Sequence, residues 1–231
     1  MKKQLKRAIA ERYTIFPNCL PLLLNMKISA LYYKNSFLHQ GFKEKKVIFT
    51  HIPKAAGSSV GNALLGHDKV GHYPLEMLLN LHPEAKGYYK FSLVRNPWDR
   101  LVSAFFFLQS GGKGGWDEKW AIKNGFPNMS FEYFLNDWLT AEKLYSYIHF
   151  IPQIDFIADE DGKLLTDEIF KIEDIDSKLE LSLTDQKLLL ELPRSNQSKR
   201  GSYQSYYTTE QMVERVRELY KADINEFNYK F

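Results

Sequence analysis

The sequence predicts an α/β fold in which a central parallel sheet is covered on both faces by helices. Two strand-loop-helix units, at residues 47–65 and 91–108, indicate that strands alternate with helices along the chain. Of the 231 residues, 44% are hydrophobic and 15% are aromatic, which is enough for the core of one large domain. This composition excludes a disordered or fibrous chain.

The first unit begins with apolar and β-branched residues at 47–52, a run typical of a buried strand. Pro53 ends this run, and the small residues 55–59 lead into a helical pattern at 60–65. Gly66 is the expected helix stop, because glycine readily adopts the left-handed conformation that ends many helices.

The second unit has a strand pattern at 91–94 that ends at Arg95. Asn96 is a good helix cap, Pro97 suits the first helical position, and Asp99 completes a capping arrangement. The helix carries an apolar stripe that we expect to face the sheet: Trp98, Leu101, Val102, Phe105 and Leu108.

Further elements follow toward the C-terminus. The expected elements are helices at 130–139 and 184–192, and strands at 154–158 and 168–172. A last helix begins at a predicted capping box of Thr208 and Gln211. Its apolar stripe is Met212, Val213, Val216, Leu219 and Tyr220.

Residues 1–45 are predicted to be an N-terminal extension, helical or irregular, that precedes a domain at 46–231. Its first twelve residues carry five basic side chains, Lys2, Lys3, Lys6, Arg7 and Arg12. They favour a solvated helix, and the alternative is peripheral contact with an anionic membrane surface. The apolar stretch 15–33 is interrupted by proline, asparagine and lysine, so we expect no membrane span.

Charge and cysteine usage narrow the function classes. The formal net charge of +3 is too balanced for a general nucleic-acid coat, and no nucleic-acid partner is expected. The single cysteine, Cys19, excludes an intramolecular disulfide and a thiolate zinc cage. Because it favours a reducing compartment, we expect a cytoplasmic protein.

The loop after the first strand has the composition of an anion-binding loop. Amide N–H groups at a helix N-terminus attract anions, and small residues allow close approach of the backbone. Ser58 and Ser59 add hydroxyl donors, and Lys54 adds a positive charge. The alternative is an ordinary strand-to-helix turn. The loop departs from the nucleoside-triphosphatase pattern, in which the lysine directly precedes the hydroxyl residue.

Two motifs resemble those of sulfotransferases that use 3′-phosphoadenosine 5′-phosphosulfate (PAPS). HIPKAAGSS at 51–59 is similar to their 5′-phosphosulfate loop, and FSLVRNPWDRLVSA at 91–104 is similar to their 3′-phosphate signature. The closest likeness is to the carbohydrate (heparan/chondroitin-type) group and its bacterial relatives, and it runs from about residue 46 to the C-terminus. FIPQIDF at 150–156 and FKIE at 170–173 follow in the family's order. The resemblance implies a P-loop-like three-layer fold with a central parallel sheet flanked by helices.

The resemblance also implies which residues bind the nucleotide. The expected cofactor-binding residues are Lys54, Ala55, Ala56, Gly57, Ser58, Ser59, Arg95 and Ser103, with Lys199, Arg200 and Gly201 as a second basic loop. Arg95 can offer a planar fork of donors to a phosphate, and the alternative for it is a salt bridge to Asp99. Arg100 is expected to be a surface or packing residue. A solvated charge cluster is the alternative for residues 199–201.

Sulfuryl transfer to an alcohol requires in-line positioning, stabilisation of the leaving phosphate, and a base. Lys54 is the expected catalytic cation, and Ser59 or Ser58 is expected to share the leaving oxygen. His72 is the expected base, because related carbohydrate sulfotransferases carry a Gly-His segment between the two motifs. An ordinary imidazole, with a pKa of about 6.5, suits proton acceptance near neutral pH. Glu76 and His51 remain alternatives, and a packing role is the alternative for His72.

The resulting hypothesis is a PAPS-dependent O-sulfotransferase acting on a hydroxyl of a carbohydrate, either a polysaccharide or a glycolipid. We expect no metal. Residues 111–116 are a candidate acceptor-side loop or a plain linker, and Gln153 matches a family position. The alternatives are a P-loop-type nucleotide kinase, a non-catalytic nucleotide-binding protein of the same fold, and a protein tyrosine as acceptor.

Overall fold

The computed structural model describes residues 38–175, 178–182, 187–192 and 201–231. The chain divides into two compact units, which are described separately here. The described part of unit 1 comprises residues 38–94 and 153–192, with the gaps just given, and that of unit 2 comprises 95–152 and 201–231. Most of the predicted N-terminal extension, with its basic residues and Cys19, lies outside the described residues.

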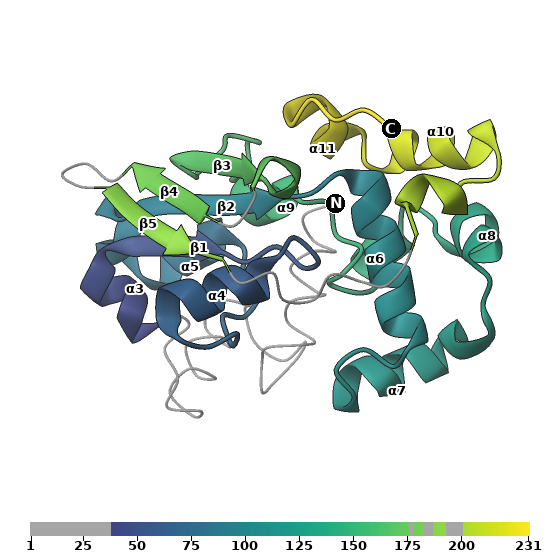
Figure 1. Cartoon of the computed structure of the whole chain (residues 1–231), viewed down its shortest axis with the longest axis horizontal. Helices are drawn as coiled ribbons and strands as arrows, with labels where there is room; N and C mark the ends of the chain where they lie inside the picture. The colour runs from purple at the N-terminus through teal and green to yellow at the C-terminus, as the bar shows by residue number, and fades with distance from the viewer. Residues whose placement is uncertain (1–37, 176–177, 183–186, 193–200) are drawn as a thin grey trace. The chain divides into compact units, whose positions relative to one another are not determined.

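Unit 1 contains the predicted parallel sheet (Figure 1). Its strands are β1 (Val47–Thr50), β2 (Tyr89–Val94) and β3 (Glu168–Lys171), in that order across the sheet. Phe49 pairs with Phe91 and Ser92 with Ile169, so all three strands run in the same direction. All four residues of β1 are buried, as the uninterrupted apolar run predicts for a central parallel sheet.

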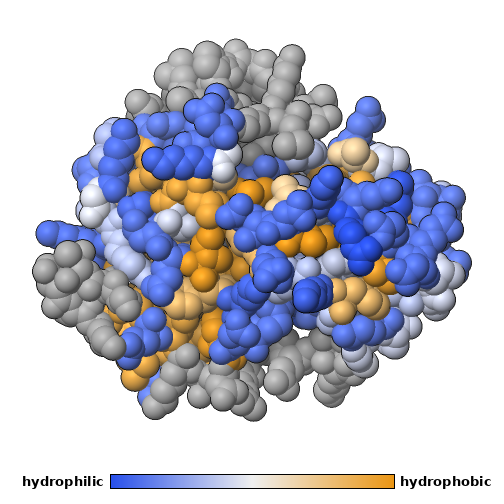
Figure 2. Space-filling model, turned by 90° about the horizontal axis from the view of Figure 1, so that it is seen from above, coloured by the Kyte–Doolittle hydropathy of each residue, from blue (hydrophilic) through white to orange (hydrophobic). Residues whose placement is uncertain are grey.

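Helices flank this sheet, and the mixed α/β class is therefore confirmed. The helices of unit 1 are α3 (Gln40–Lys45), α4 (Gly57–Leu65), α5 (Leu75–Leu81) and α9 (Ile154–Ile157), with 3-10 turns at Pro83–Gly87 and Ile172–Asp174. Gly66 ends α4 in the left-handed conformation, as predicted. Partly buried apolar side chains, including Leu165 and Phe170, pack against the core of this unit. Figure 2 shows hydrophobic residues gathered on the face of the molecule seen from above.

Two predicted elements of unit 1 are wrong. Residues 154–158 form the short helix α9 and a single bridge from Ala158 to Leu164, because a short apolar run does not by itself distinguish helix from strand. The predicted helix at 184–192 is a strand where it is described. β5 (Lys187–Glu191) pairs antiparallel with β4 (Lys178–Ser182) and places Leu190 opposite Leu179 in the core. The burial of these leucines outweighs their local helix preference.

Unit 2 is built around α6 (Pro97–Gln109). The predicted cap is confirmed, because Asn96 Oδ1 accepts from the Trp98 N–H at 3.1 Å and Pro97 is the first helical residue. The other elements are α7 (Gly115–Lys123), α8 (Phe131–Tyr133), α10 (Glu210–Leu219), α11 (Lys221–Glu226), a π turn at Phe134–Trp138, and 3-10 turns at Phe126–Asn128, Lys143–Tyr145 and Tyr203–Tyr206.

The apolar stripe of α6 is buried as predicted. Within unit 2, the Phe105 ring of this stripe lies 5.1–5.9 Å from the rings of Phe126, Phe131 and Phe134. The expected packing of the stripe on the sheet stays a prediction. Phe134 begins the π turn, so the predicted helix at 130–139 is present with a widened second half. Aromatic pairs at these separations contribute beyond their buried area.

The last predicted helix is confirmed, with its cap shifted by one residue. Thr209, rather than Thr208, precedes α10 and accepts from the Met212 N–H at 3.3 Å. Thr209 has the extended backbone conformation that a cap requires, whereas the Thr208 hydroxyl contacts Met212 Sδ at 3.4 Å. No helix within the described ranges is both long and apolar enough to cross a membrane.

Candidate functional site

The loop between β1 and α4 presents amide groups that have no acceptor among the described residues. Lys54 and Ala56 both adopt left-handed conformations, with φ of 68° and 55°. Among the described residues, the N–H groups of Ala56, Gly57 and Ser58 donate no hydrogen bond. Alternation of left- and right-handed residues turns successive amides to one side and forms an anion-binding concavity. The loop therefore has the backbone of an anion site at a helix N-terminus.

The helix begins earlier than the sequence pattern predicts. We expected it at residue 60, but α4 starts at Gly57, because the small residues 57–59 continue the helix instead of joining the loop. Ser58 is half-buried and Ser59 is buried in its first turn, while Lys54 is half-buried before it. The positive end of the α4 dipole and the Lys54 ammonium thus both belong to one short segment.

A glycine is required at position 57 because the His51 side chain fills the space beside it, and not because of the backbone angle at this position. A Cβ at this position would lie 1.7 Å from His51 Cδ2 and 2.0 Å from His51 Nε2, so no larger residue fits. His51 follows β1, is buried, and stacks on Phe49 with ring centroids 5.8 Å apart. His51 therefore packs at the end of β1, and this packing extends to the anion loop.

His72 lies against the same histidine. Its Nδ1 donates to the backbone oxygen of His51 at 2.9 Å, and the two imidazole centroids are 4.1 Å apart. Because a carbonyl oxygen only accepts, this hydrogen bond places the proton of neutral His72 on Nδ1 and the lone pair on Nε2. Gly71, with φ of 78°, makes the turn that brings His72 to this place. The structure thus brings together the loop, His51 and a half-buried His72.

Glu76 does not orient the imidazole of His72. It lies in the first turn of α5, and its carboxylate accepts from the Glu160 N–H at 3.3 Å. The contact that orients His72 is the backbone oxygen of His51. Sequence reasoning named His51 only as an alternative base and missed this supporting role, because the contact joins residues 21 positions apart.

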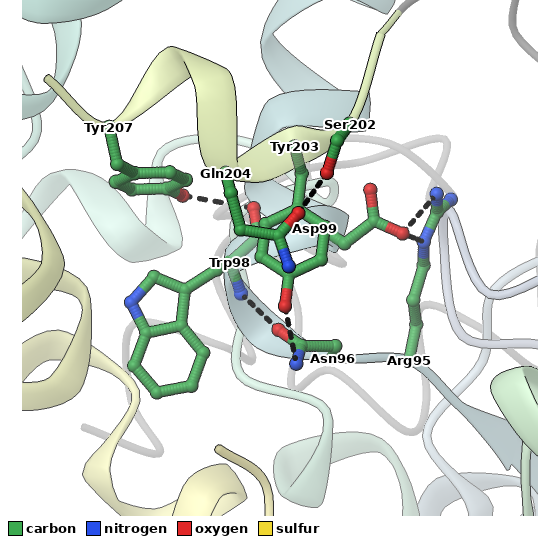
Figure 3. Close-up of polar contacts among 8 residues, drawn as sticks. All are labelled: Arg95, Asn96, Trp98, Asp99, Ser202, Tyr203, Gln204 and Tyr207. Carbon is green, nitrogen blue, oxygen red and sulfur yellow. Dashed lines mark hydrogen bonds and ion pairs between the residues drawn. The ribbon is translucent and has the colours of Figure 1, made fainter. Parts of the chain in front are cut away.

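The second motif begins in strand β2 of unit 1, and its part from Arg95 onward lies in unit 2. That part begins with an ion pair (Figure 3). Arg95 Nε and Nη2 donate to Asp99 Oδ2 at 2.8 and 2.7 Å, and the two side chains are about one-fifth exposed. The salt bridge considered as the alternative for Arg95 is therefore present. It uses two of the five donors of a guanidinium, so it does not exclude an anion as a further partner. Ser103, half-buried, is one turn beyond Asp99 on α6, and its side chain makes no hydrogen bond to a described residue.

The start of α6 is tied to the segment after residue 200. Asn96 Nδ2 donates to the Tyr203 hydroxyl at 3.3 Å, and Tyr207 donates to the Trp98 backbone oxygen (Figure 3). Asn96 Nδ2 also donates to the Lys230 backbone oxygen at 2.8 Å. Gly201, which is exposed, is two residues before Tyr203. The other two residues of the predicted basic loop, at positions 199 and 200, lie outside the described residues. Sequence reasoning missed Tyr203, for which a Tyr-rich stretch was the only signal.

Arg100 is buried rather than a surface residue. It donates to the Ile151 backbone oxygen at 2.8 Å, and complete burial lowers the pKa of its guanidinium. Tyr220 donates to the Phe150 backbone oxygen at 2.8 Å, and burial raises the pKa of its phenol. Asp223, also buried, favours the charged form of Arg100. Arg100 on α6 and Tyr220 after α10 thus donate to two adjacent backbone oxygens, and the group is a packing element.

The candidate acceptor-side loop at 111–116 is held by contacts of the first turn of α7. Buried Asp117 accepts from the Lys113 N–H at 3.2 Å and from the Tyr147 hydroxyl, while Trp116 beside it is 58% exposed. Gln153, the other family position, is fully buried in unit 1.

Three of the remaining histidines have other contacts. His39 Nε2 donates to the Val70 backbone oxygen at 3.1 Å, and burial lowers the pKa of its imidazole. His82 contacts Glu84, and His149 is buried against Phe107. Among the described residues, no group of three or more histidine, cysteine, aspartate or glutamate side chains is arranged to hold a metal ion.

Comparison with known proteins agrees with the two motifs. The family model described as the sulfotransferase family matches residues 42–230, which includes the anion loop, His72, Arg95 and Ser103. A search of curated proteins and a search of solved structures each found no match to the chain. Because the match covers most of the sequence and the parallel sheet with its strand-loop-helix units is present, the chain belongs to the sulfotransferase family.

Proposed function

We propose that the protein is a PAPS-dependent O-sulfotransferase that acts on a hydroxyl of a carbohydrate, either a polysaccharide or a glycolipid. The observation that carries the proposal is the loop at 51–59, in which three successive amides have no acceptor among the described residues and His72 lies against His51. An anion site beside a base is what sulfuryl transfer from a phosphosulfate to an alcohol requires.

Each residue has a role in this reaction. The amides of Ala56, Gly57 and Ser58 bind the 5′-phosphosulfate of the donor. His72 Nε2 accepts the proton of the acceptor hydroxyl as its oxygen forms a bond to sulfur and the bond from sulfur to the bridging phosphate oxygen breaks. Lys54, with a hydroxyl from Ser59 or Ser58, stabilises the charge that develops on that oxygen. The products are a sulfate ester and adenosine 3′,5′-bisphosphate.

The second motif serves the other end of the nucleotide in this proposal. Arg95 and Ser103 bind the 3′-phosphate, and a phosphate that reaches Arg95 has to share its donors with Asp99. Ala55 belongs to the phosphosulfate loop. Gly201, with Lys199 and Arg200 before it, contributes a basic loop, and the link from Tyr203 to Asn96 supports its assignment to this motif.

The carbohydrate acceptor and the cellular setting rest on sequence reasoning alone. The likeness to the heparan/chondroitin-type group favours a sugar hydroxyl over a protein tyrosine. We further propose that residues 46–231 form the sulfotransferase domain and that the protein is cytoplasmic. The basic residues of 1–45 then provide peripheral membrane contact.

Two measurements test this function. Titration calorimetry is expected to show tighter binding of adenosine 3′,5′-bisphosphate than of ATP, in the absence of magnesium. Equal affinity for ATP, or a strict metal requirement, would favour the kinase alternative. Incubation with labelled PAPS and a panel of glycans, glycolipids and tyrosine peptides, read by mass spectrometry, identifies the acceptor. Binding of the bisphosphate without transfer to any panel member would favour a non-catalytic protein.

A further inference from the structure

A column of four aromatic rings connects the core of the sheet to His72. Phe91 on β2 lies 5.1 Å from Phe49 on β1, Phe49 lies 5.8 Å from His51, and His51 lies 4.1 Å from His72, measured between ring centroids. Phe91, Phe49 and His51 are buried, and His72 is half-buried. His72 is therefore at the outer end of a column whose inner end is fixed by the sheet.

The third ring of the column also touches the anion loop. The edge of His51 that carries Cδ2 and Nε2 occupies the space that a side chain at Gly57 would need. Gly57 is the first residue of α4, and its amide is one of the three without an acceptor among the described residues. One imidazole thus contacts both the loop that is proposed to bind the donor and the proposed base.

We propose that His51 is a positioning residue, whose ring sets the place of His72 relative to the anion loop by packing between Gly57 and His72. This inference rests on the proposed function of His72 as base. The backbone oxygen of residue 51 fixes the Nδ1 proton of His72 whatever the side chain is. The ring of His51 supplies what the backbone does not, which is lateral support for the His72 ring and a fixed spacing from Gly57.

The size of the ring is the property that matters in this proposal. In close-packed interiors a side chain that fills a space cannot be shortened without movement of its neighbours. Loss of the ring removes the packing of His51 against His72 and leaves the hydrogen bond to the backbone oxygen of residue 51 in place. A misplacement of about 1 Å at a catalytic group can lower turnover by about 100-fold.

A size exchange between positions 51 and 57 tests the contact itself. Gly57→Ala alone is expected to lower Tm by about 3–10 °C, because the new methyl group meets the imidazole. In the His51→Ala background the same substitution is expected to have less than about a third of that effect. An equal effect in both backgrounds would show that His51 does not restrict Gly57. This measurement does not depend on any activity.

Three substitutions of His51 test its action on His72. His51→Ala is expected to lower turnover by about 10- to 100-fold while the affinity for adenosine 3′,5′-bisphosphate changes by less than about three-fold. His51→Phe, which keeps a planar ring without nitrogen atoms, is expected to recover turnover to within about three-fold of wild type. His51→Asn keeps a polar group near the position of Nδ1 but lacks the ring edge that carries Cδ2 and Nε2. It is therefore not expected to recover turnover. His82→Ala, a histidine that contacts Glu84, is the matched control.

The outcomes separate this proposal from the proposed function. Full turnover of His51→Ala, or recovery by Asn and not by Phe, would overturn the positioning role and assign His51 a polar role instead. If His51→Phe lowers Tm more than His51→Ala does, its turnover does not report on function. The size exchange and the turnover of His51→Ala then decide whether His51 positions His72. Absence of bisphosphate binding and of transfer in the wild-type protein would instead remove the proposed function and leave the size exchange as the test of the contact.

Discussion

The loop that follows β1 and the helix start that follows β2 are the two proposed anion motifs, and their hydrogen-bond donors differ in the partners they already have. In the loop, the amides of Ala56, Gly57 and Ser58 have no acceptor among the described residues. In the second motif, the guanidinium of Arg95 already donates twice to the Asp99 carboxylate. The backbone of the first is arranged for an anion in advance, whereas the second is a charge-balanced pair.

This difference indicates which of the two motifs should affect turnover and which should affect nucleotide affinity. Donors that are fixed by the backbone need no rearrangement when charge develops on a leaving group, which makes the loop suited to catalysis. An arginine that is already paired gains less from a new anion, because the anion also meets the carboxylate. We therefore expect the loop and its histidine to control turnover, and the Arg95 motif to control affinity.

The largest expected effect belongs to His72. His72→Ala is expected to lower turnover by about 100- to 10,000-fold, the usual contribution of a general base, and to leave bisphosphate affinity nearly unchanged. In wild type, turnover rises with pH as the imidazole loses its proton and then levels off, because only the neutral form accepts a proton. A pH–rate curve and a melting curve on the same variant check this. A folded variant with full turnover and the same pH profile would show that His72 only packs.

Lys54 comes second. Lys54→Ala is expected to lower turnover by about 100- to 1,000-fold and to weaken bisphosphate binding far less, since its contact strengthens as the leaving oxygen becomes charged. Single-turnover kinetics with saturating donor and calorimetry with the bisphosphate separate the two effects. If the variant loses only affinity and keeps wild-type turnover at saturation, the loop binds the donor without assisting bond cleavage, and the contrast between the two motifs disappears.

For Arg95 we expect the opposite, a larger loss of bisphosphate affinity than of turnover. Arg95→Ala should weaken bisphosphate binding by about 10- to 150-fold, which corresponds to charge-assisted hydrogen bonds worth about 1.5–3 kcal/mol. Turnover at saturating donor should fall much less, because the 3′-phosphate is distant from the reacting sulfur. Ser103→Ala is the companion variant, and it should weaken binding by only a few-fold because it removes a neutral donor. A larger loss of turnover than of affinity for Arg95→Ala would contradict this division.

The sequence predicted the parts of the fold that depend on local patterns. The apolar run of β1, the Asn96 cap and the Gly66 stop are each determined by a few neighbouring residues, and all three are confirmed. The strand β5 was missed because its three leucines favour a helix locally, and only the pairing with β4 decides otherwise. The aromatic partners of Phe105 within unit 2 were not predicted, because an apolar stripe predicts burial without specifying which residues cover it.

The site divides in the same way. The spacing of Arg95 and Asp99 by four residues was enough to name their salt bridge as the alternative to phosphate binding, and it is present. The anion site at the loop stays a prediction from the loop composition. The contact of His51 with Gly57 and His72 depends on where the chain returns after α4, which no local pattern encodes. Gly57 and Gly71 were the only sequence signals of that contact that we identified.

The smallest expected effect concerns Asp99 and tests the charge balance of the second motif. Asp99→Asn keeps an oxygen that accepts from Arg95 but removes the negative charge that a phosphate meets there. Repulsion between two like charges about 4 Å apart is worth about 1 kcal/mol in bulk water, so bisphosphate affinity should rise by at least about three- to five-fold. The exposed part of the pair contributes little to folding, and the free energy of unfolding should change by about 0.5 kcal/mol or less.

Calorimetry at two salt concentrations checks the sign of the change in bisphosphate affinity for Asp99→Asn, because the gain in affinity should shrink as salt screens the charges. Weaker binding in place of tighter binding would mean that the full carboxylate charge is needed to hold the guanidinium in its binding orientation, and Arg95 would then be as pre-arranged as the loop.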